Sequence, residues 1–344
     1  MHTKNHSLIS PLSKRGRTRV KEEKTVKTSN NTSVTINTTS IEEFAEKIVE
    51  KLRSDNLNAE IGIRKVQKNN GLVLTGLTIR CEEENITPTL YLDNFYENAE
   101  GEVSDELISH IKKVYENSRI NGIDVRWFQD YDLVKPNLRM RLINKVANEE
   151  ILKDTPYLEY GDLAVIFEVK VDLPTTGRAG AVVKDIHMGT WGATVEELFS
   201  AAVENQRSEF VITPMWKVLV ELMGSGAGTM PEEALEEIKA DNTLSVLSNE
   251  DKMYGAVGLV FTDMLTEYAE EIGDNLWIIP SSLHEVLIAP SSRMPEEAVT
   301  QMIREVNDTQ LATEEVLSDH VYFFDRETST LCLTSNGPEM PKLI

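Results

Sequence analysis

The chain has 344 residues, of which 40% are hydrophobic, and its 57 acidic and 35 basic residues give a formal net charge of −22. Two cysteines exclude a disulfide-stabilised secreted scaffold, and Cys81 and Cys332 alone cannot supply a four-ligand zinc site. No stretch approaches the roughly 18 apolar residues of a membrane span, and residues 1–14 lack the apolar segment of a signal peptide. We therefore expect a cytoplasmic protein without a membrane partner.

Charge is distributed unevenly along the chain. Residues 1–40 carry eight basic and two acidic residues, whereas residues 41–344 carry 27 basic and 55 acidic residues. The first segment has almost no large apolar residue after Leu12, so burial cannot offset the entropy of ordering it, and we predict a disordered basic tail. The tail is either an arm for nucleic acid or a membrane surface, or a solvated extension along the acidic body. The charge of the body favours the extension.

The first part of the acidic body, residues 41–158, begins with a helix, three strands and a helix. Ser40 and Glu43 form a capping box ahead of apolar residues at helical spacing, which predicts a helix from residue 41. Asn70-Gly71 between two alternating runs predicts a β-hairpin, because these residues accept the positive φ of a tight turn. Ser104 is expected to cap the second helix. The predicted strands cover residues 59–68, 72–80 and 89–92.

The rest of the chain alternates hairpins with helices. We predict helices at residues 138–152, after Thr194, at 215–223, from Pro231, at 264–272, and at 298–306 after Pro295. The predicted strands cover residues 163–173, 181–188, 255–261, 276–279, 284–289, 321–324 and 330–333. Because successive strands are too closely linked for parallel crossovers, the expected fold class is α+β, with mostly antiparallel mixed sheets covered by helices. Residues 41–158 and 159–344 form either two domains or one continuous domain.

Sequence signatures of bound phosphate, metal or cofactor are weak. The glycine-rich residues 224–228 follow a helix rather than a strand, and Glu232 and Glu233 would compete with a phosphate for the next helix N-terminus. We interpret this segment as a flexible linker between helices. The four histidines outside the tail lack the spacing of a helical metal site. We therefore expect no cofactor and no metal.

Two polar segments supply candidate catalytic residues. Residues 281–285 begin a strand with apolar residues on both faces, so their polar groups are costly to bury unless they are paired. Asp185 and His187 share one face of the strand predicted at residues 181–188. The ingredients of acyl transfer are Ser281 or Ser282 as nucleophile, His284 or His187 as base, and Asp185 or Glu285 as orienting carboxylate. The competing interpretation, which we favour, is structural: the serines bond backbone groups and a carboxylate satisfies a core histidine.

Several short motifs follow one another along the acidic body. They are Asn69-Asn70-Gly71, Gly76-Leu77-Thr78-Ile79, Asn85-Ile86-x-Pro88-Thr89-x-Tyr91-Leu92, Phe95-Tyr96, His187-Met188, Trp191-Gly192, Thr194-x-Glu196-Glu197-Leu198, Pro280-Ser281-Ser282-x-His284-Glu285-Val286, Asn307-x-Thr309, Glu314-Glu315-Val316-Leu317-Ser318-Asp319 and Tyr322. Together they resemble an uncharacterised family from gut Clostridia and related Firmicutes, catalogued as domain of unknown function 5688, over most of residues 41–330. The resemblance implies a bacterial, intracellular protein and implies no reaction, catalytic residue or cofactor. It does not extend to the basic tail or to residues 224–241.

The surplus of carboxylates without a strong catalytic signature favours a non-enzymatic binding protein that docks a basic protein surface. It could mimic the charge of nucleic acid, or serve as an accessory factor of a mobile element or phage that blocks a host defence. Nucleic acid itself is not expected as a ligand of the body, because most of the surface would repel phosphates. The alternative is a hydrolase that uses a serine, a histidine and a carboxylate around residues 281–285. A shared pocket for these groups would favour the hydrolase.

Overall fold

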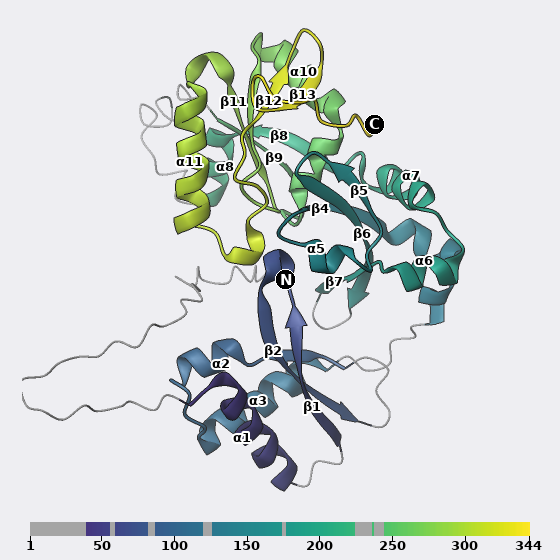
Figure 1. Cartoon of the computed structure of the whole chain (residues 1–344), viewed down its shortest axis with the longest axis vertical. Coiled ribbons are helices and arrows are strands. Elements are labelled where there is room, and N and C mark those ends of the chain that lie inside the picture. The colour runs from purple at the N-terminus through teal and green to yellow at the C-terminus, as the bar shows by residue number, and fades with distance from the viewer. Residues whose placement is uncertain are drawn as a thin grey trace, which may run out of the picture. The chain divides into compact units, whose positions relative to one another are not determined.

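The computed structural model describes residues 39–55, 59–81, 87–119, 126–173, 177–223, 236 and 244–344 (Figure 1). Most of the predicted basic tail, the glycine-rich residues 224–228 and the start of the helix predicted at Pro231 lie outside these ranges. The chain divides into two units, Met1–Asn37 and Thr38–Ile344. None of the described helices is long and apolar enough to cross a membrane.

The first sheet has the order β1-β2-β3 and is antiparallel throughout. Its strands are β1 (Ala59–Gln67), β2 (Val73–Cys81) and β3 (Thr89–Tyr91), and the accompanying helices are α1 (Ile41–Ser54), α2 (Asp93–Asn98) and α3 (Asp105–Ser118). The Ser40–Glu43 capping box and the Ser104 cap are both present. Asn70 and Gly71 take the predicted positive φ at the hairpin turn, 56° and 71°. Apolar side chains of α1, α3, β2 and neighbouring residues form one buried cluster.

The second sheet places β6 at its centre. Its members are β4 (Leu138–Asn144), β5 (Tyr157–Tyr160), β6 (Leu163–Leu173) and β7 (Gly177–Val182); β4, β5 and β7 all pair antiparallel with β6. The domain boundary considered between residues 158 and 159 falls inside β5, and residues on both sides of it pair with β6. A division at this point would therefore cut through the second sheet.

Two predictions in this region are wrong. The helix expected at residues 138–152 is the strand β4 followed by the short helix α5 (Glu149–Leu152), because buried Leu138, Met140 and Leu142 alternate with half-buried arginines at a period of two. The strand expected at residues 181–188 ends at Val182, and α6 (Asp185–Trp191) follows it. Asp185 in the first turn suits the positive end of the helix dipole.

The third sheet has the order β13-β12-β10-β11-β9-β8, and every pair is antiparallel. Its strands are β8 (Phe210–Pro214), β9 (Ser245–Asn249), β10 (Leu276–Ile279), β11 (Val286–Pro290), β12 (Tyr322–Asp325) and β13 (Thr330–Leu333). The longer helices around it are α7 (Val195–Gln206), α8 (Met215–Met223), α10 (Thr262–Ile272) and α11 (Glu296–Thr309). Antiparallel sheets with separate helices confirm the α+β class.

A third prediction is also wrong, since the strand expected at residues 255–261 is the 3-10 helix η5 (Gly255–Val260). All six of its residues are buried, and a short apolar run buried on every side has no polar alternation to separate strand from helix. Within the described residues, the remaining short helices are α4 (Tyr131–Val134) and 3-10 helices at Asn69–Gly71, Arg126–Gln129, Lys135–Asn137, Ser291–Arg293 and Thr313–Glu315.

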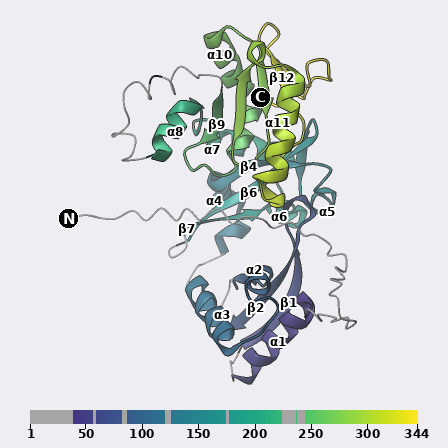
Figure 2. The same cartoon turned by 90° about the vertical axis from the view of Figure 1, so that its left-hand side faces the viewer.

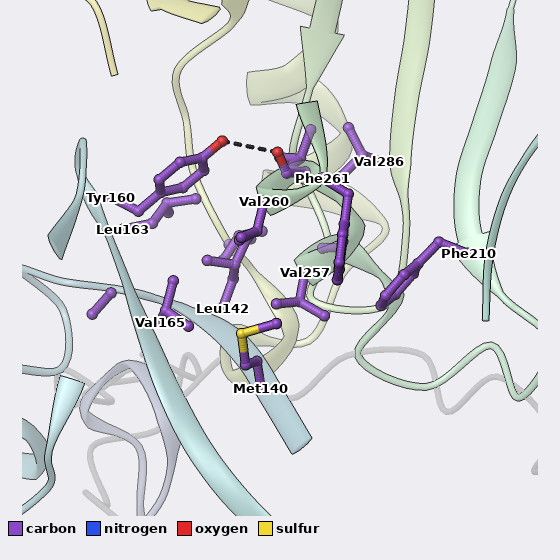
Figure 3. Packing of buried hydrophobic residues seen from close by; sticks show 14 of the residues in the cluster. Met140, Leu142, Tyr160, Leu163, Val165, Phe210, Val257, Val260, Phe261 and Val286 are labelled. Atoms are coloured by element: carbon purple, nitrogen blue, oxygen red, sulfur yellow. Dashed lines mark hydrogen bonds between the residues drawn. The ribbon is translucent and has the colours of Figure 1, made fainter. Parts of the chain in front are cut away.

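Side chains of β10 alternate between two apolar clusters. Trp277 and Ile279 pack with Val299 and Ile303 of α11, and Figure 2 shows α11 alongside this sheet. The intervening Leu276 and Ile278 belong to the largest cluster, which also includes buried residues of β4, β6 and η5. Figure 3 shows part of this cluster, with a hydrogen bond from the Tyr160 hydroxyl to the Leu259 carbonyl at 2.9 Å. The second and third sheets therefore share one core.

Candidate functional site

The two candidate serines lie in the buried turn that follows β10. Ser281 is 5% exposed and Ser282 is 2% exposed. The Leu317 N–H donates to the Ser281 carbonyl at 2.9 Å, and Ser282 forms a β-bridge with Val316. The Ser282 Oγ accepts a hydrogen bond from the His284 N–H at 3.0 Å. Ser281 is therefore held in the backbone framework through its carbonyl, and Ser282 through its bridge and its hydroxyl.

His284 is half-buried, two residues before the start of β11. Its Nδ1 accepts a hydrogen bond from the Tyr254 N–H at 3.2 Å, and its Nε2 lies 3.8 Å from Oε1 of Glu315. The imidazole also stacks on the Tyr254 ring, with centroids 5.5 Å apart. Because Nδ1 acts as an acceptor, the proton of the neutral ring resides on Nε2, on the side of Glu315. Both nitrogens therefore face groups other than a serine hydroxyl.

Glu285 follows His284 and is largely buried. Burial raises the pKa of the Glu285 carboxyl, the His284 imidazole opposes this rise, and the Glu315 carboxylate adds to it. A hydrogen bond with Ser282 also favours the ionised form. His284, Glu285 and Glu315 thus lie close enough for their charges to interact.

Asp185 and His187 lie on helix α6 rather than on a strand. The His187 Nδ1 accepts a hydrogen bond from the Lys184 N–H at 3.1 Å, which closes the first turn of the helix. The imidazole packs edge-on against Phe128, with centroids 5.1 Å apart, and burial, followed by the charge of Lys184, lowers its pKa. Among the described residues, no hydrogen bond or ion pair joins Asp185 or His187 to residues 281–285, so the structure does not assemble the two polar segments into one triad.

A cluster that sequence reasoning missed surrounds Asp162, in the turn between β5 and β6. Its carboxylate accepts hydrogen bonds from the Ser318 hydroxyl at 2.7 Å and the Tyr322 hydroxyl at 2.5 Å, and its Oδ2 lies 2.9 Å from Nδ1 of His320. Burial, together with the charge of Asp162, raises the pKa of Tyr322. In the sequence, this cluster is indicated only by the polar residues Ser318, His320 and Tyr322 at every second position.

The Asp162 cluster orients an imidazole without supplying a nucleophile. The His320 side chain is 56% exposed, so its ring reaches solvent beside the buried carboxylate. The Ser318 hydroxyl, however, donates to the same Asp162 oxygen rather than to the imidazole. A triad requires the serine on the nitrogen that faces away from the carboxylate. The cluster therefore connects the β5–β6 turn to the segment that leads into β12.

Exposed carboxylates gather on two helices that contain no basic residue. On α10 they are Asp263, Glu267, Glu270 and Glu271. On α7 they are Glu196, Glu197 and Glu204. Arg207, directly after α7, pairs with Asp263 and so joins the two helices. We call these seven carboxylates the α7–α10 acidic surface.

Within the described ranges, no group of three or more His, Cys, Asp or Glu side chains could hold a metal ion. No curated protein and no solved structure matches the chain. Residues 41–326 match the model of a family described as a family of unknown function (DUF5688), which confirms the resemblance seen in the motifs. Because this match covers most of the chain, the protein belongs to the DUF5688 family.

Proposed function

We propose that this protein is a non-enzymatic binding protein whose acidic body docks a basic macromolecular surface. The observation that carries the proposal is the α7–α10 acidic surface, whose two helices contain no basic residue. Exposed like charges repel one another, and a cationic partner relieves that repulsion. The family motifs further support a cytoplasmic protein of Firmicutes bacteria.

Pairing within the body does not neutralise its carboxylates. Ion pairs such as Lys51–Asp105, Lys145–Glu159 and Lys184–Asp154 occupy basic side chains. With 55 acidic and 27 basic residues in the body, about half of the carboxylates would lack a partner even if every basic residue formed one pair. This surplus of carboxylates supports a partner that presents positively charged groups.

A basic protein is the best-supported class of partner. Nucleic acid would be repelled by the body, whereas a DNA- or RNA-binding protein presents lysines and arginines that carboxylates can contact in place of phosphates. In this form the protein acts as a nucleic-acid mimic, and an accessory factor of a mobile element or phage could use such mimicry against a host defence.

The hydrolase alternative has weaker support. A nucleophilic serine needs its hydroxyl within hydrogen-bond distance of a base. Here the Ser282 hydroxyl accepts from a backbone N–H, and the His284 ring nitrogens face the Tyr254 N–H and the Glu315 carboxylate. The geometry around residues 281–285 therefore favours the structural interpretation.

The test measures binding of the full chain to poly-L-lysine at low and high NaCl, for the wild type and two triple variants. One variant carries Glu267→Gln, Glu270→Gln and Glu271→Gln on α10; the control carries Glu46→Gln, Glu50→Gln and Glu102→Gln, which are exposed elsewhere. Affinity should fall steeply with salt, because charges farther apart than about 10 Å are screened at 0.1 M salt. The α10 variant should lose several-fold more affinity than the control. Equal losses, or binding that is independent of salt, would contradict the proposal.

A further inference from the structure

A cavity of about 470 Å³ lies over the charged face of the second sheet. Its floor includes Arg139 of β4 and Glu168 and Lys170 of β6, which share one face because Arg139 is the register partner of Glu168 and strand side chains alternate. The opposite face of the same strands supplies the apolar core, including Leu138 and Val169. The cavity therefore has a polar floor built on regular strands. Strands hold the side chains of a binding site more precisely than loops do.

The glycine at position 180 makes room on this floor. Gly180 of β7 is the register partner of Lys170, and a Cβ atom there would lie 2.9 Å from Oε2 of Glu168. Only a residue without a side chain leaves space for the carboxylate in its observed position. Arg141 shares this face of β4 with Arg139; its Nη1 lies 3.6 Å from Oε2 of Glu168 and its guanidinium carbon 4.6 Å from the centroid of the Tyr254 ring. Arg141 thus orients the Glu168 carboxylate, and Gly180 leaves room for it.

The floor carries both positive and negative side chains, and some of them are available to bind a ligand. Arg139 is already paired with Glu209, another lining residue. In the ranges that the structure describes, the Lys170 side chain has neither an ion pair nor a hydrogen bond. Burial raises the pKa of Glu168, and the nearby Arg141 and Arg139 oppose the rise, so this carboxylate is poorly solvated. An ammonium group on a ligand would restore the solvation that burial removes.

The wall of the cavity is the turn after β9. The Asn249 side chain clamps this turn, because its Nδ2 donates to the Met253 carbonyl at 2.9 Å and its Oδ1 accepts from the Met253 N–H at 3.1 Å. Tyr254 takes a positive φ of 54°, a strained conformation for a residue with a side chain, and the bond from its N–H to His284 holds it there. Strain of this kind concentrates at ligand sites. The turn brings Met253, which is 53% exposed, beside the charged floor.

We propose that this cavity binds a small zwitterion, an α-amino acid or a close analogue. Lys170, with Arg139, would take the carboxylate; Glu168 would take the ammonium group; and Met253 with Tyr254 would contact the side chain. A simple anion is disfavoured because Glu168, Glu209 and Asp251 outnumber the two lining cations, and a simple cation is disfavoured because it would meet Lys170 and Arg139. The volume lies within the usual 300–1,000 Å³ or so of small-molecule sites. This site is separate from the proposed docking surface and does not depend on it.

The first experiment uses the full chain and the twenty protein amino acids, each tested by saturation-transfer NMR and then by calorimetry. The tightest binder is compared with the amine that lacks its carboxylate and with the acid that lacks its ammonium group. Each half-ligand should bind about tenfold more weakly or worse, because each loses a charge-assisted hydrogen bond. Binding by none of the amino acids at millimolar concentration overturns the proposal. So does a half-ligand that binds as tightly as its parent.

The second experiment locates the site. Lys170→Met should weaken binding about tenfold, and Gly180→Ala should weaken it by displacing Glu168. Lys47→Met, on the exposed face of α1, is the matched control and should leave binding unchanged. Thermal unfolding of each variant confirms that it is folded, and the nearly isosteric Glu168→Gln provides a second probe of the floor. Wild-type affinity in both Lys170→Met and Glu168→Gln would place the ligand elsewhere and reject the assignment.

Discussion

Tyr160 is completely buried, yet its hydroxyl donates to the Leu259 carbonyl at 2.9 Å, so the cost of burying a polar group is offset. Burial raises the pKa of this tyrosine above its ordinary range, which keeps the hydroxyl available as a donor. The sequence shows that the tyrosine ring is apolar enough to be buried. It does not show which group accepts the hydrogen bond from the hydroxyl, because Leu259 lies 99 residues away along the chain. Polar partners of this kind depend on long-range packing.

The partners of the candidate site residues were equally hidden from the sequence, because they come from distant segments. The sequence indicated that Ser282, His284 and Glu285 lie at the start of a buried strand and need partners. It did not indicate Tyr254 and Glu315, which approach His284 from segments 30 and more residues away. Asp162 was missed for the same reason, since its three partners come from residues 318–322.

The raised pKa of Glu285 predicts a specific dependence of stability on pH. Below its usual value of 4.5 the carboxyl is protonated in both the folded and the unfolded chain. As pH rises above this value, the unfolded state loses its proton first, so the free energy of unfolding falls until the pH passes the raised folded-state pKa. Glu285→Gln carries no such charge. We therefore expect the variant to gain stability relative to the wild type as pH increases from about 4.5.

Urea unfolding of both proteins between pH 4 and pH 8 measures this difference. Glu204→Gln, at an exposed position on α7, is the control and should show a much smaller change with pH. A stability difference between Glu285→Gln and the wild type that stays constant over the range would contradict the assigned effect of burial.

At the scale of elements, local hydrogen bonds made several helix starts predictable. In α7 the Glu197 N–H donates to Oγ1 of Thr194 at 3.2 Å, and the Thr194 N–H donates to Oε2 of Glu197 at 2.8 Å. All partners lie within four residues, so the sequence contains the whole interaction. By contrast, the segments that form β4, α6 and η5 were predicted wrongly. Their local sequence is compatible with either helix or strand, and tertiary packing decides between the two.

Removal of the α7 cap tests this interaction. Thr194→Ala should lower the free energy of unfolding by about 1 kcal/mol, because the first-turn N–H loses its acceptor. The control is Ser200→Ala in the same helix; Ser200 donates only to the Glu196 carbonyl one turn earlier, and alanine is the stronger helix former. The control should change stability by less than about 0.5 kcal/mol in urea unfolding. Equal losses in the two variants would refute the capping contribution.

Two glycines should respond to alanine in opposite directions. Gly71 has φ +71° at the hairpin turn and no steric clash, so Gly71→Ala should cost about 1–2 kcal/mol through backbone strain alone. Gly189 lies inside α6, where an added Cβ atom would meet no other atom within 4 Å, so Gly189→Ala should gain up to about 1 kcal/mol. Thermal unfolding of the two variants distinguishes the signs, and a gain in Gly71→Ala would show that the turn does not require the left-handed conformation.

At the scale of the whole molecule, charge and packing oppose each other. The largest apolar cluster joins residues from β4 through β13, while the net charge of −22 favours expansion through self-repulsion. Exposed ion pairs offset this only slightly, at about 0–1 kcal/mol each. Long-range repulsion should therefore dominate the response of stability to salt.

We expect the unfolding temperature to rise by a few degrees when NaCl is increased from about 0.05 M to about 0.5 M, because screening weakens the repulsion among surplus carboxylates. Differential scanning fluorimetry over a salt series measures the change. Near the isoelectric point the same series should show little effect, since the surplus is neutralised there. A falling unfolding temperature at neutral pH would mean that ion pairs outweigh the repulsion.

The sequence by itself determined the local and additive properties of this protein: the capped helix starts, the positive-φ hairpin turn, the antiparallel α+β class, the family and the surplus of carboxylates. Each depends on residues a few positions apart or on a simple sum of charges. The tertiary structure alone decided which residues face one another, such as Glu168 with Gly180, Tyr254 with His284, and Asp162 with His320. Alternation along a strand fixes which residues share a face, but strand order and long-range packing decide what lies opposite them.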